Sequence, residues 1–339
     1  MPLKQVEVTI PKQGKGSIEK LLAGDFIIDY WQGKLDSPSE NYLVKVLIDA
    51  SDGEQFLDNA EHVLENHEGF RIIMTPVDAT IPRIKEPEKE VKEKEPLQPW
   101  EQPLKGLRVS REELFTTISD GIALNRIYIA MVILSTIVAA LGILRDNTAV
   151  VIGAMVIAPI LAPNIGLALA TTLGDYELGV KALRTNLAGL SIAFVISVIF
   201  GFIMNVDITN YEIAIRTEVH LSDISLALAS GAAGVLAYTV GMSAAVIGVM
   251  VAVALLPPLV TCGLLLGNMQ WSYAFFSFVL LMTNVICVNL AAVATFIIQG
   301  VRPRTWYETK TAKKTNKIAL IIWVTLLTIL AVIIFFSSM

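Results

Sequence analysis

Two stretches decide the fold: residues 149–163 read AVVIGAMVIAPILAP, and residues 244–258 read AAVIGVMVAVALLPP. At an offset of 95 positions, eight of the 15 residue pairs are identical. Shared apolar composition rarely places Gly, Met and Pro in one register, so the similarity predicts an internal duplication. The identical pairs include Gly153/Gly248, Met155/Met250 and Pro163/Pro258.

The sequence around these stretches is unusually poor in charge. The 339 residues are 54% hydrophobic and 17% charged, whereas soluble proteins have about 25% charged residues. Residues 1–126 hold 16 basic and 23 acidic residues, and residues 127–339 hold 10 and 8. A spanning helix needs about 20 apolar residues, and the second part has charge-free runs of that length, which excludes a soluble enzyme or disulfide scaffold. These runs are 127–144, 147–174, 185–206, 224–301 and 318–339.

The apolar runs predict about seven spans and a polytopic α-helical membrane domain. Each duplicated unit contains three spans, so the second unit is expected to be inserted upside down. We place the first membrane repeat at 126–206, an external loop at 207–222 and the second repeat at 223–301. A cytosolic loop at 302–317 and a final span at 318–339 follow. The spans are expected at 126–144, 147–173, 185–206, 223–242, 244–267, 271–299 and 318–338.

Loop charges give the expected orientation. Loop 302–317 has six basic residues against Glu308, so it is expected in the cytosol. Lys181 and Arg184 are expected in an inner loop at 174–184, and the acidic loop after residue 206 is expected outside. A cytosolic N-terminus satisfies all three. The alternative is that 147–173 and 244–267 re-enter without crossing, which would make the two copies parallel.

The N-terminal domain, residues 1–82, has a different pattern. Strands are predicted at 4–10, 25–32, 41–49 and 70–77, with helices at 17–23 and from 51 to 67. This βαββαβ order is typical of a ferredoxin-like domain, so the fold class is α+β. No signal peptide is expected. A charged, proline-rich linker at 83–109 and an amphipathic juxtamembrane helix at 110–125 are expected to follow.

The best regulatory ligand site in this domain is the turn containing Gly14, Lys15, Gly16 and Ser17. Backbone N–H groups at a helix start can bind the phosphate of a nucleotide or another small metabolite. The alternative is an ordinary turn with Ser17 as the helix N-cap. His62 and His67 are expected to be solvated on an exposed helix face.

Prolines in the middle of the repeated spans indicate broken helices. A proline removes one backbone donor and blocks a carbonyl, and two inverted broken spans are typical of transporters. Nearby Gly, Met and Asn residues are the other candidates for a pore or solute site, although each of them also fits a packing role. The candidates are Gly153, Met155, Pro159, Pro163, Asn164, Gly248, Met250, Pro257, Pro258, Asn284 and Asn289.

The chemistry available in the spans is limited. They lack mid-depth Asp, Glu, Lys and Arg, and the chain has no ATP-binding motif, no catalytic constellation and too few histidines for a metal site. Cys262 and Cys287 are expected to be free buried thiols. A passive pathway, or an ion held by carbonyls and amides, fits better than a pump or an enzyme.

Several motifs resemble the bacterial and archaeal membrane proteins of domain-of-unknown-function family 389. The resemblance covers nearly the whole chain and implies an integral membrane location with a hydrophobic repeat. It implies no substrate, cofactor or catalytic residue. The motifs are Ser110-Arg111-Glu112-Glu113-Leu114, residues 134–140 (LSTIVAA), residues 146–159 (DNTAVVIGAMVIAP), Gly174-Asp175, residues 6–11 (VEVTIP) and Asp29-Tyr30-Trp31.

Together these features predict a channel or facilitator for a small ion or solute, regulated by a ligand-sensing cytosolic domain. The rival is a non-conducting membrane receptor or scaffold whose N-terminal domain binds a partner or metabolite. The expected location is the cytoplasmic membrane of a prokaryote. The expected partners are the lipid bilayer, a small-molecule regulator and further copies of the chain as a homo-oligomer, with no nucleic acid.

Overall fold

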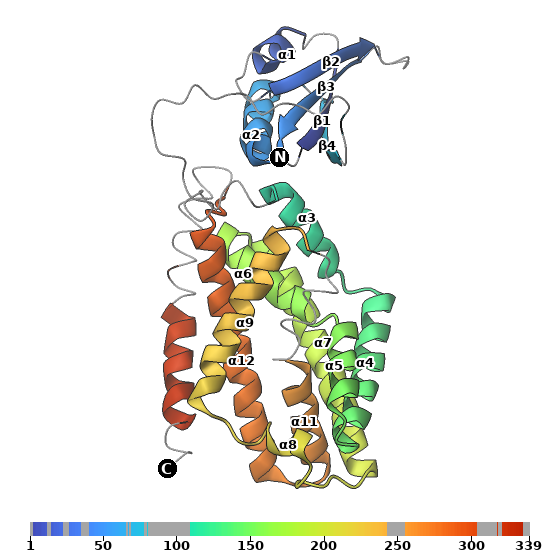
Figure 1. Ribbon diagram of the computed structural model, residues 1–339, viewed down its shortest axis with the longest axis vertical. Helices are drawn as coiled ribbons and strands as arrows, with labels where there is room; N and C mark the ends of the chain where they lie inside the picture. Colours follow the sequence, from blue (N-terminus) through green and yellow to red (C-terminus); the bar gives the residue numbers. More distant parts are fainter. Residues whose placement is uncertain are drawn as a thin grey trace. The chain divides into compact units, whose positions relative to one another are not determined.

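A computed structural model covers residues 1–339, and the chain divides into two compact units, Met1–Glu112 and Glu113–Met339. Each unit is a separate body with its own packing (Figure 1). The structure describes residues 3–11, 15–22, 27–34, 41–65, 67, 69–77, 80, 109–242, 255–303, 317 and 321–334.

The first unit contains one four-stranded antiparallel sheet and two helices. The sheet order is β2-β3-β1-β4, so the first strand lies in the middle between the third and the fourth. The expected βαββαβ order is therefore confirmed. Its elements are β1 (Leu3–Ile10), α1 (Lys15–Leu22), β2 (Ile27–Lys34), β3 (Tyr42–Asp49), α2 (Gly53–Leu64) and β4 (Arg71–Val77), with a 3-10 turn at Ala50–Asp52.

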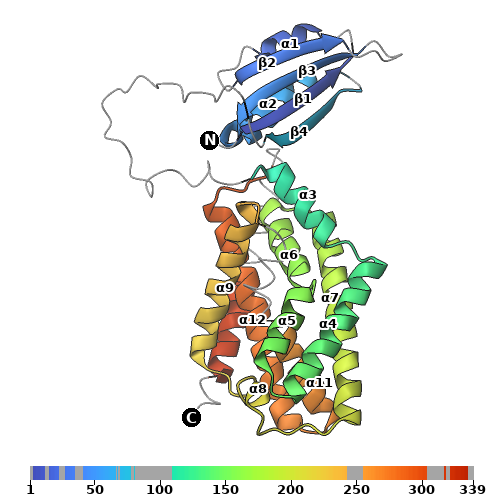
Figure 2. The same ribbon diagram turned by 45° about the vertical axis from the view of Figure 1, so that its right-hand side comes forward.

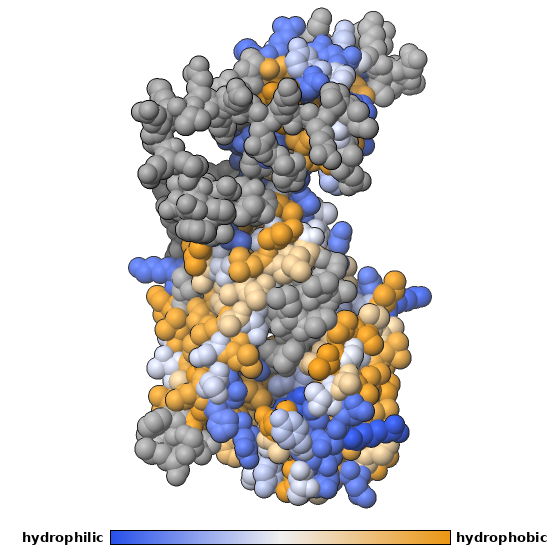
Figure 3. Space-filling view, viewed as in Figure 1, coloured by the Kyte–Doolittle hydropathy of each residue, from blue (hydrophilic) through white to orange (hydrophobic). Residues whose placement is uncertain are grey.

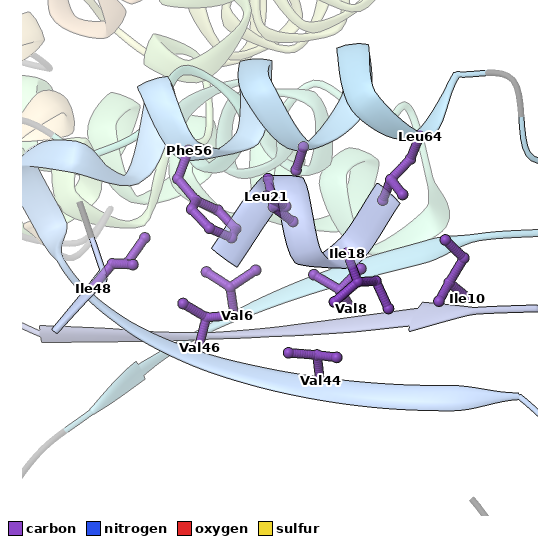
Figure 4. Packing of buried hydrophobic residues seen from close by; sticks show 11 residues of the cluster. Val6, Val8, Ile10, Ile18, Leu21, Val44, Val46, Ile48, Phe56 and Leu64 are labelled. Atoms are coloured by element: carbon purple, nitrogen blue, oxygen red, sulfur yellow. The ribbon is translucent and has the colours of Figure 1, made fainter. Parts of the chain in front are cut away.

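One face of this sheet is buried under α1 and α2 (Figure 4). Alternate residues of β1, such as Val6 and Val8, point into the core because side chains alternate across a strand. Phe56 of α2 packs over them. On the opposite face, Glu7 of β1 pairs with Lys45 of β3 at 2.6 Å, and this pairing lowers the pKa of Glu7.

The second unit is helical. Among its described helices, four are long and apolar enough to cross a membrane, namely α4, α7, α9 and α12, and the bent pair α5–α6 makes a fifth if it is one span. Hydrophobic side chains cover much of the visible face of this unit, and hydrophilic ones gather at the end that carries α8 (Figure 3). The helices are α3 (Arg111–Gly121), α4 (Arg126–Leu144), α5 (Thr148–Ile157), α6 (Leu161–Leu173), α7 (Tyr176–Ile203), α8 (Tyr211–Ala214), α9 (Leu221–Thr239), α11 (Leu256–Gly267), α12 (Trp271–Ile298) and a helix at 321–334.

Hydrogen bonds between segments reveal the direction of the long helices. At one end of the bundle, Asn210 donates to the Leu144 carbonyl at the end of α4 (3.2 Å), and Asn268 donates to the Val206 carbonyl beyond α7 (3.3 Å). At the other end, Thr185 of α7 donates to the Ile122 carbonyl (2.7 Å). The helices α4 and α7 therefore end where α9 and α12 begin (Figure 2).

The helix bounds repeat along the chain. Adding 95 to both bounds of α4 yields the bounds of α9, and the same shift converts α7 into α12. The shift also converts the first residue of α6 into the first residue of α11, which ends one residue earlier than the shift predicts. Packing follows the same pattern, because α6 and α11 each lie against both α7 and α12.

The expected start of the third long helix is wrong. The third long helix, expected from residue 185, already begins at Tyr176, so Lys181 and Arg184 lie in α7 rather than in a loop. Gly174 ends α6 with a φ of 72°, and the Asp175 carboxylate then accepts a hydrogen bond from the Leu178 N–H at 2.9 Å. A capped start lets the helix extend past its charged first turns. Residues 243–254, the first half of the fifth expected span, lie outside the described residues.

Candidate functional site

The centre of the candidate site is the break between α5 and α6. The two helices bend by 50° across Ala158, Pro159 and Ile160. Among the described residues, no backbone N–H donates to the carbonyl oxygens of Val156 or Ile157. A helix end leaves its last carbonyls without intrahelical partners, so the end of α5 leaves two carbonyls without a described backbone donor.

Three of the four prolines predicted at the broken spans lie at the starts of the helices α6 and α11. Pro163 lies in the first turn of α6, and Pro257 and Pro258 lie in the first turn of α11. The N–H groups of a first turn have no intrahelical acceptor, so proline costs no hydrogen bond there. Only Pro159 lies in the break itself, where it is partly buried.

Asn164 and Asn289 come together at this break. The Asn164 amide donates to the Ile160 carbonyl at 3.0 Å, and so ties the first turn of α6 to the break. The Asn289 amide on α12 donates to Asn164 Oδ1 at 3.1 Å and to the Val285 carbonyl at 2.8 Å. Both side chains are at most 2% exposed. Two of the residues predicted for the pore or solute site are therefore direct neighbours.

The hydrogen bonds of Asn289 fix which way its amide faces. Val285 offers a carbonyl and Asn164 offers its Oδ1, so the Asn289 nitrogen must face both acceptors. The remaining atom, Asn289 Oδ1, is buried and has no hydrogen-bond partner among the described residues. Leaving such an acceptor unsatisfied costs about 1–3 kcal/mol. This oxygen therefore needs a donor or a cation.

The other predicted pore residues are placed less tightly. Met155 is buried on α5, and Asn284 is buried on α12, five residues before Asn289. A Cβ on Gly153 would meet no described atom within 4 Å, so no described helix packs closely against this glycine. Gly248 and Met250 lie outside the described residues.

A buried polar cluster at the end of the bundle was not anticipated. Glu212 of α8 is fully buried, and its Oε2 lies 2.7 Å from Arg216 Nη1. The Glu212 N–H donates to Asp146 at 2.8 Å, and its Oε1 accepts from the Thr148 hydroxyl. Ser277 of α12 donates to the Arg216 carbonyl at 2.8 Å.

This cluster holds the start of α5 in place. Asp146 lies between α4 and α5 with a φ of 52°, and the Asn147 side chain caps α5 by accepting from the Val150 N–H. Burial lowers the pKa of Arg216, and the neighbouring Glu212 carboxylate opposes that effect. From the sequence, Glu212 and Arg216 are expected only as charges of the loop after residue 206. The signal that pointed to them was Asp146-Asn147-Thr148, a polar triplet directly before an apolar repeat.

The N-terminal candidate site is altered by a side-chain contact. Helix α1 begins at Lys15, so Gly16 and Ser17 lie in its first turn, and Ser17 is not the N-cap. The Ser17 hydroxyl lies 3.0 Å from His67 Nε2. His67, expected on a solvated helix face, lies beyond the end of α2 and is partly buried. Gly14 lies outside the described residues.

A groove of about 560 Å³ lies between α7, α11 and α12. Its walls are almost entirely apolar and contain neither Asn164 nor Asn289, so it is separate from the break. Cys262 lies in its wall, and both Cys262 and Cys287 are free, buried thiols as expected. The described part of the chain contains no group of three or more residues that could hold a metal through His, Cys, Asp or Glu. The lining includes Leu190, Phe194, Leu259, Trp271, Phe275 and Phe278.

The four or five long apolar helices among the described residues indicate a multi-pass membrane protein, whose first unit is a βαββαβ domain. The family described as Domain of unknown function (DUF389) matches residues 155–290, which include the break and both asparagines. Uncharacterized protein MJ0678 of Methanocaldococcus jannaschii is 33% identical over 336 residues, 99% of this chain and 100% of that relative. The chain belongs to the DUF389 family. No solved structure matches it significantly.

Proposed function

We propose that the protein is a channel or facilitator for a small ion or solute in the cytoplasmic membrane, and that it is not an enzyme. The observation that carries this proposal is the buried Asn164–Asn289 pair beside a helix break with unpaired carbonyls. Polar groups inside a membrane bundle are costly, and irregular backbone is tolerated there where it is buried in protein or lines a polar pathway.

An inverted repeat supports this proposal. The constant shift of 95 between α4 and α9, and between α7 and α12, extends the sequence similarity to whole helices. The opposite directions of these paired helices fit one three-span module that was copied and inserted upside down. Helices α6 and α11 both begin inside the bundle, as the half-helices of inverted-repeat transporters do.

A seven-span arrangement with a cytosolic N-terminal unit follows from the same module. Lys181 donates to Ser119 at 3.3 Å, so this basic residue lies at the end of the bundle where α7 begins. The acidic Asp207 and Glu218 lie in the segment between α7 and α9, at the opposite end. Positive charge inside and acidic loops outside favour this orientation. The N-terminal unit would then bind a regulatory metabolite, and several copies of the chain would assemble.

The second candidate is a non-conducting receptor or scaffold. Tight packing of α7 on α11 favours it, because a Cβ on Gly201 would overlap the Leu264 backbone and one on Gly267 would overlap the Val198 carbonyl. Such contacts give a rigid interface between the two halves of the bundle. In this interpretation the break would only shape the packing.

The test is flux through purified full-length protein in liposomes. Chloride salts of monovalent cations and small neutral solutes, one per experiment, would be loaded on one side. We expect flux above empty liposomes for at least one of them, and a loss of that flux in Asn289→Leu. Equal leakage from empty and protein-containing liposomes for every compound would favour the scaffold.

A further inference from the structure

We propose that the break between α5 and α6 binds one dehydrated monovalent metal cation, with Asn289 Oδ1 as a fixed ligand. The carbonyl oxygens of the same break would complete the site. This inference deepens the proposed function, because it names the class of ion that the break recognises.

The side-chain atom left over beside the break is an acceptor. Both hydrogens of the Asn289 amide are used, by Asn164 Oδ1 and the Val285 carbonyl, so only its oxygen remains. The carbonyls of Val156 and Ile157 receive no backbone N–H from the described residues. Neutral oxygens without a donor favour a cation over an anion.

The charge of the site selects a monovalent ion. Divalent Ca²⁺ and Mg²⁺ sites in proteins normally include carboxylate ligands. Among the described residues of α5, α6 and α12, no Asp or Glu is present. Carbonyl oxygens alone are sufficient for K⁺ in channel filters. Na⁺ or K⁺ therefore fits these ligands better than a divalent ion.

The repeat provides an internal comparison. Shifting Asn164 by 95 positions leads to Leu259, and shifting Asn289 back by 95 leads to Phe194. Both of these counterparts line the apolar groove between α7, α11 and α12. Two copies of one module thus carry a polar pair at one position and an apolar pair at the other. We infer a single cation site rather than two.

The binding test uses the detergent-solubilised full chain and measures its unfolding temperature in NaCl, KCl or N-methyl-D-glucamine chloride at equal ionic strength. We expect saturable stabilisation by Na⁺ or K⁺ and none by the bulky organic cation. Asn289→Leu should weaken the apparent affinity by about 10-fold or more, since it removes one charge-assisted ligand. Asn289→Asp should tighten binding and add a response to Ca²⁺.

The matched control is Thr283→Val on the same helix. Thr283 is fully buried, and within the described part of the chain its hydroxyl bonds only to the Val279 carbonyl of its own helix, at 2.8 Å, so its replacement should leave cation affinity unchanged. Stabilisation that is equal for all cations, or unchanged in both Asn289 variants, would overturn the inference and indicate a bound water instead. Flux without cation binding would contradict only this inference. Cation binding without flux would contradict only the proposed transport function.

Discussion

Asn289 donates a hydrogen bond of 3.1 Å to Asn164, 125 residues earlier in the chain. The bond connects α12 to the first turn of the half-helix α6, directly after the break. The Asn164 amide in turn donates a hydrogen bond to the Ile160 carbonyl. The two halves of the bundle are therefore joined by a buried amide chain at the point where one helix is interrupted.

Replacing both asparagines together should cost less stability than the two single replacements suggest. Asn164→Leu strands the Asn289 donor and the Ile160 carbonyl, with an expected loss of about 1–3 kcal/mol. Asn289→Leu leaves Asn164 Oδ1 without its partner and should have a similar effect. In the double variant the shared bond is lost only once, so the free energy of unfolding in detergent should be non-additive by at least about 0.5 kcal/mol. Strict additivity would mean that the two side chains do not interact.

Much of the fold was predictable, because charges and caps mark helix ends. Helix α4 has the expected bounds: Asn125 caps it by accepting from the Tyr128 N–H at 2.7 Å, and Arg145 follows it. The alternating residues of β1 likewise predicted its buried face. The start of α7 differs from the prediction because Lys181 and Arg184 resemble loop charges. The capping residue Asp175 is the signal that the helix begins before them.

The sequence predicted individual residues of the site, but it did not predict that they are in contact. Asn164 and Asn289 each offered an amide, but sequence spacing contains no information on which helices touch. Burial of Glu212 was equally hidden, because a loop carboxylate is normally solvated unless partners such as Thr148 and Arg216 surround it. His67 was misplaced because α2 ends at Leu64, earlier than its polar sequence suggests.

Close packing between α7 and α11 predicts a strong effect of side-chain size. Gly201→Leu should destabilise the protein by several kcal/mol or prevent its assembly, because the first added carbon already overlaps the Leu264 backbone. Thermal unfolding in detergent measures the loss. The control is Gly153→Ala on α5, where a Cβ meets no described atom within 4 Å. That change should be neutral or raise stability by up to about 1 kcal/mol through helix propensity. Equal losses in both variants would contradict the packing described.

The proposed inverted repeat predicts opposite accessibility for two exposed positions. Arg184 near the start of α7 and Glu218 between α7 and α9 lie toward opposite ends of the bundle. In intact cells a membrane-impermeant maleimide should label Glu218→Cys and should label Arg184→Cys only after permeabilisation. The native Cys262 and Cys287 are at most 3% exposed and should contribute little background. Labelling of both variants from the same side would refute the inverted arrangement.

Loss of the Glu212 side chain should destabilise α5 more than it destabilises α9. Removing one partner from a buried ion pair typically costs about 3–5 kcal/mol, so Glu212→Ala should be strongly destabilising because it leaves Arg216 buried without its carboxylate. Glu212→Gln keeps an acceptor for the Thr148 hydroxyl and should lose less.

The distinguishing measurement is hydrogen exchange by segment. Because Asp146 and Thr148 bind Glu212 directly at the start of α5, exchange in 148–157 should accelerate in Glu212→Ala before exchange in 221–239 does. A double variant, Glu212→Met with Arg216→Met, should recover part of the stability, since no unpaired charge remains buried. Protection of α5 that stays at the wild-type level in Glu212→Ala would show that the apolar packing of α5 holds it in place without this cluster.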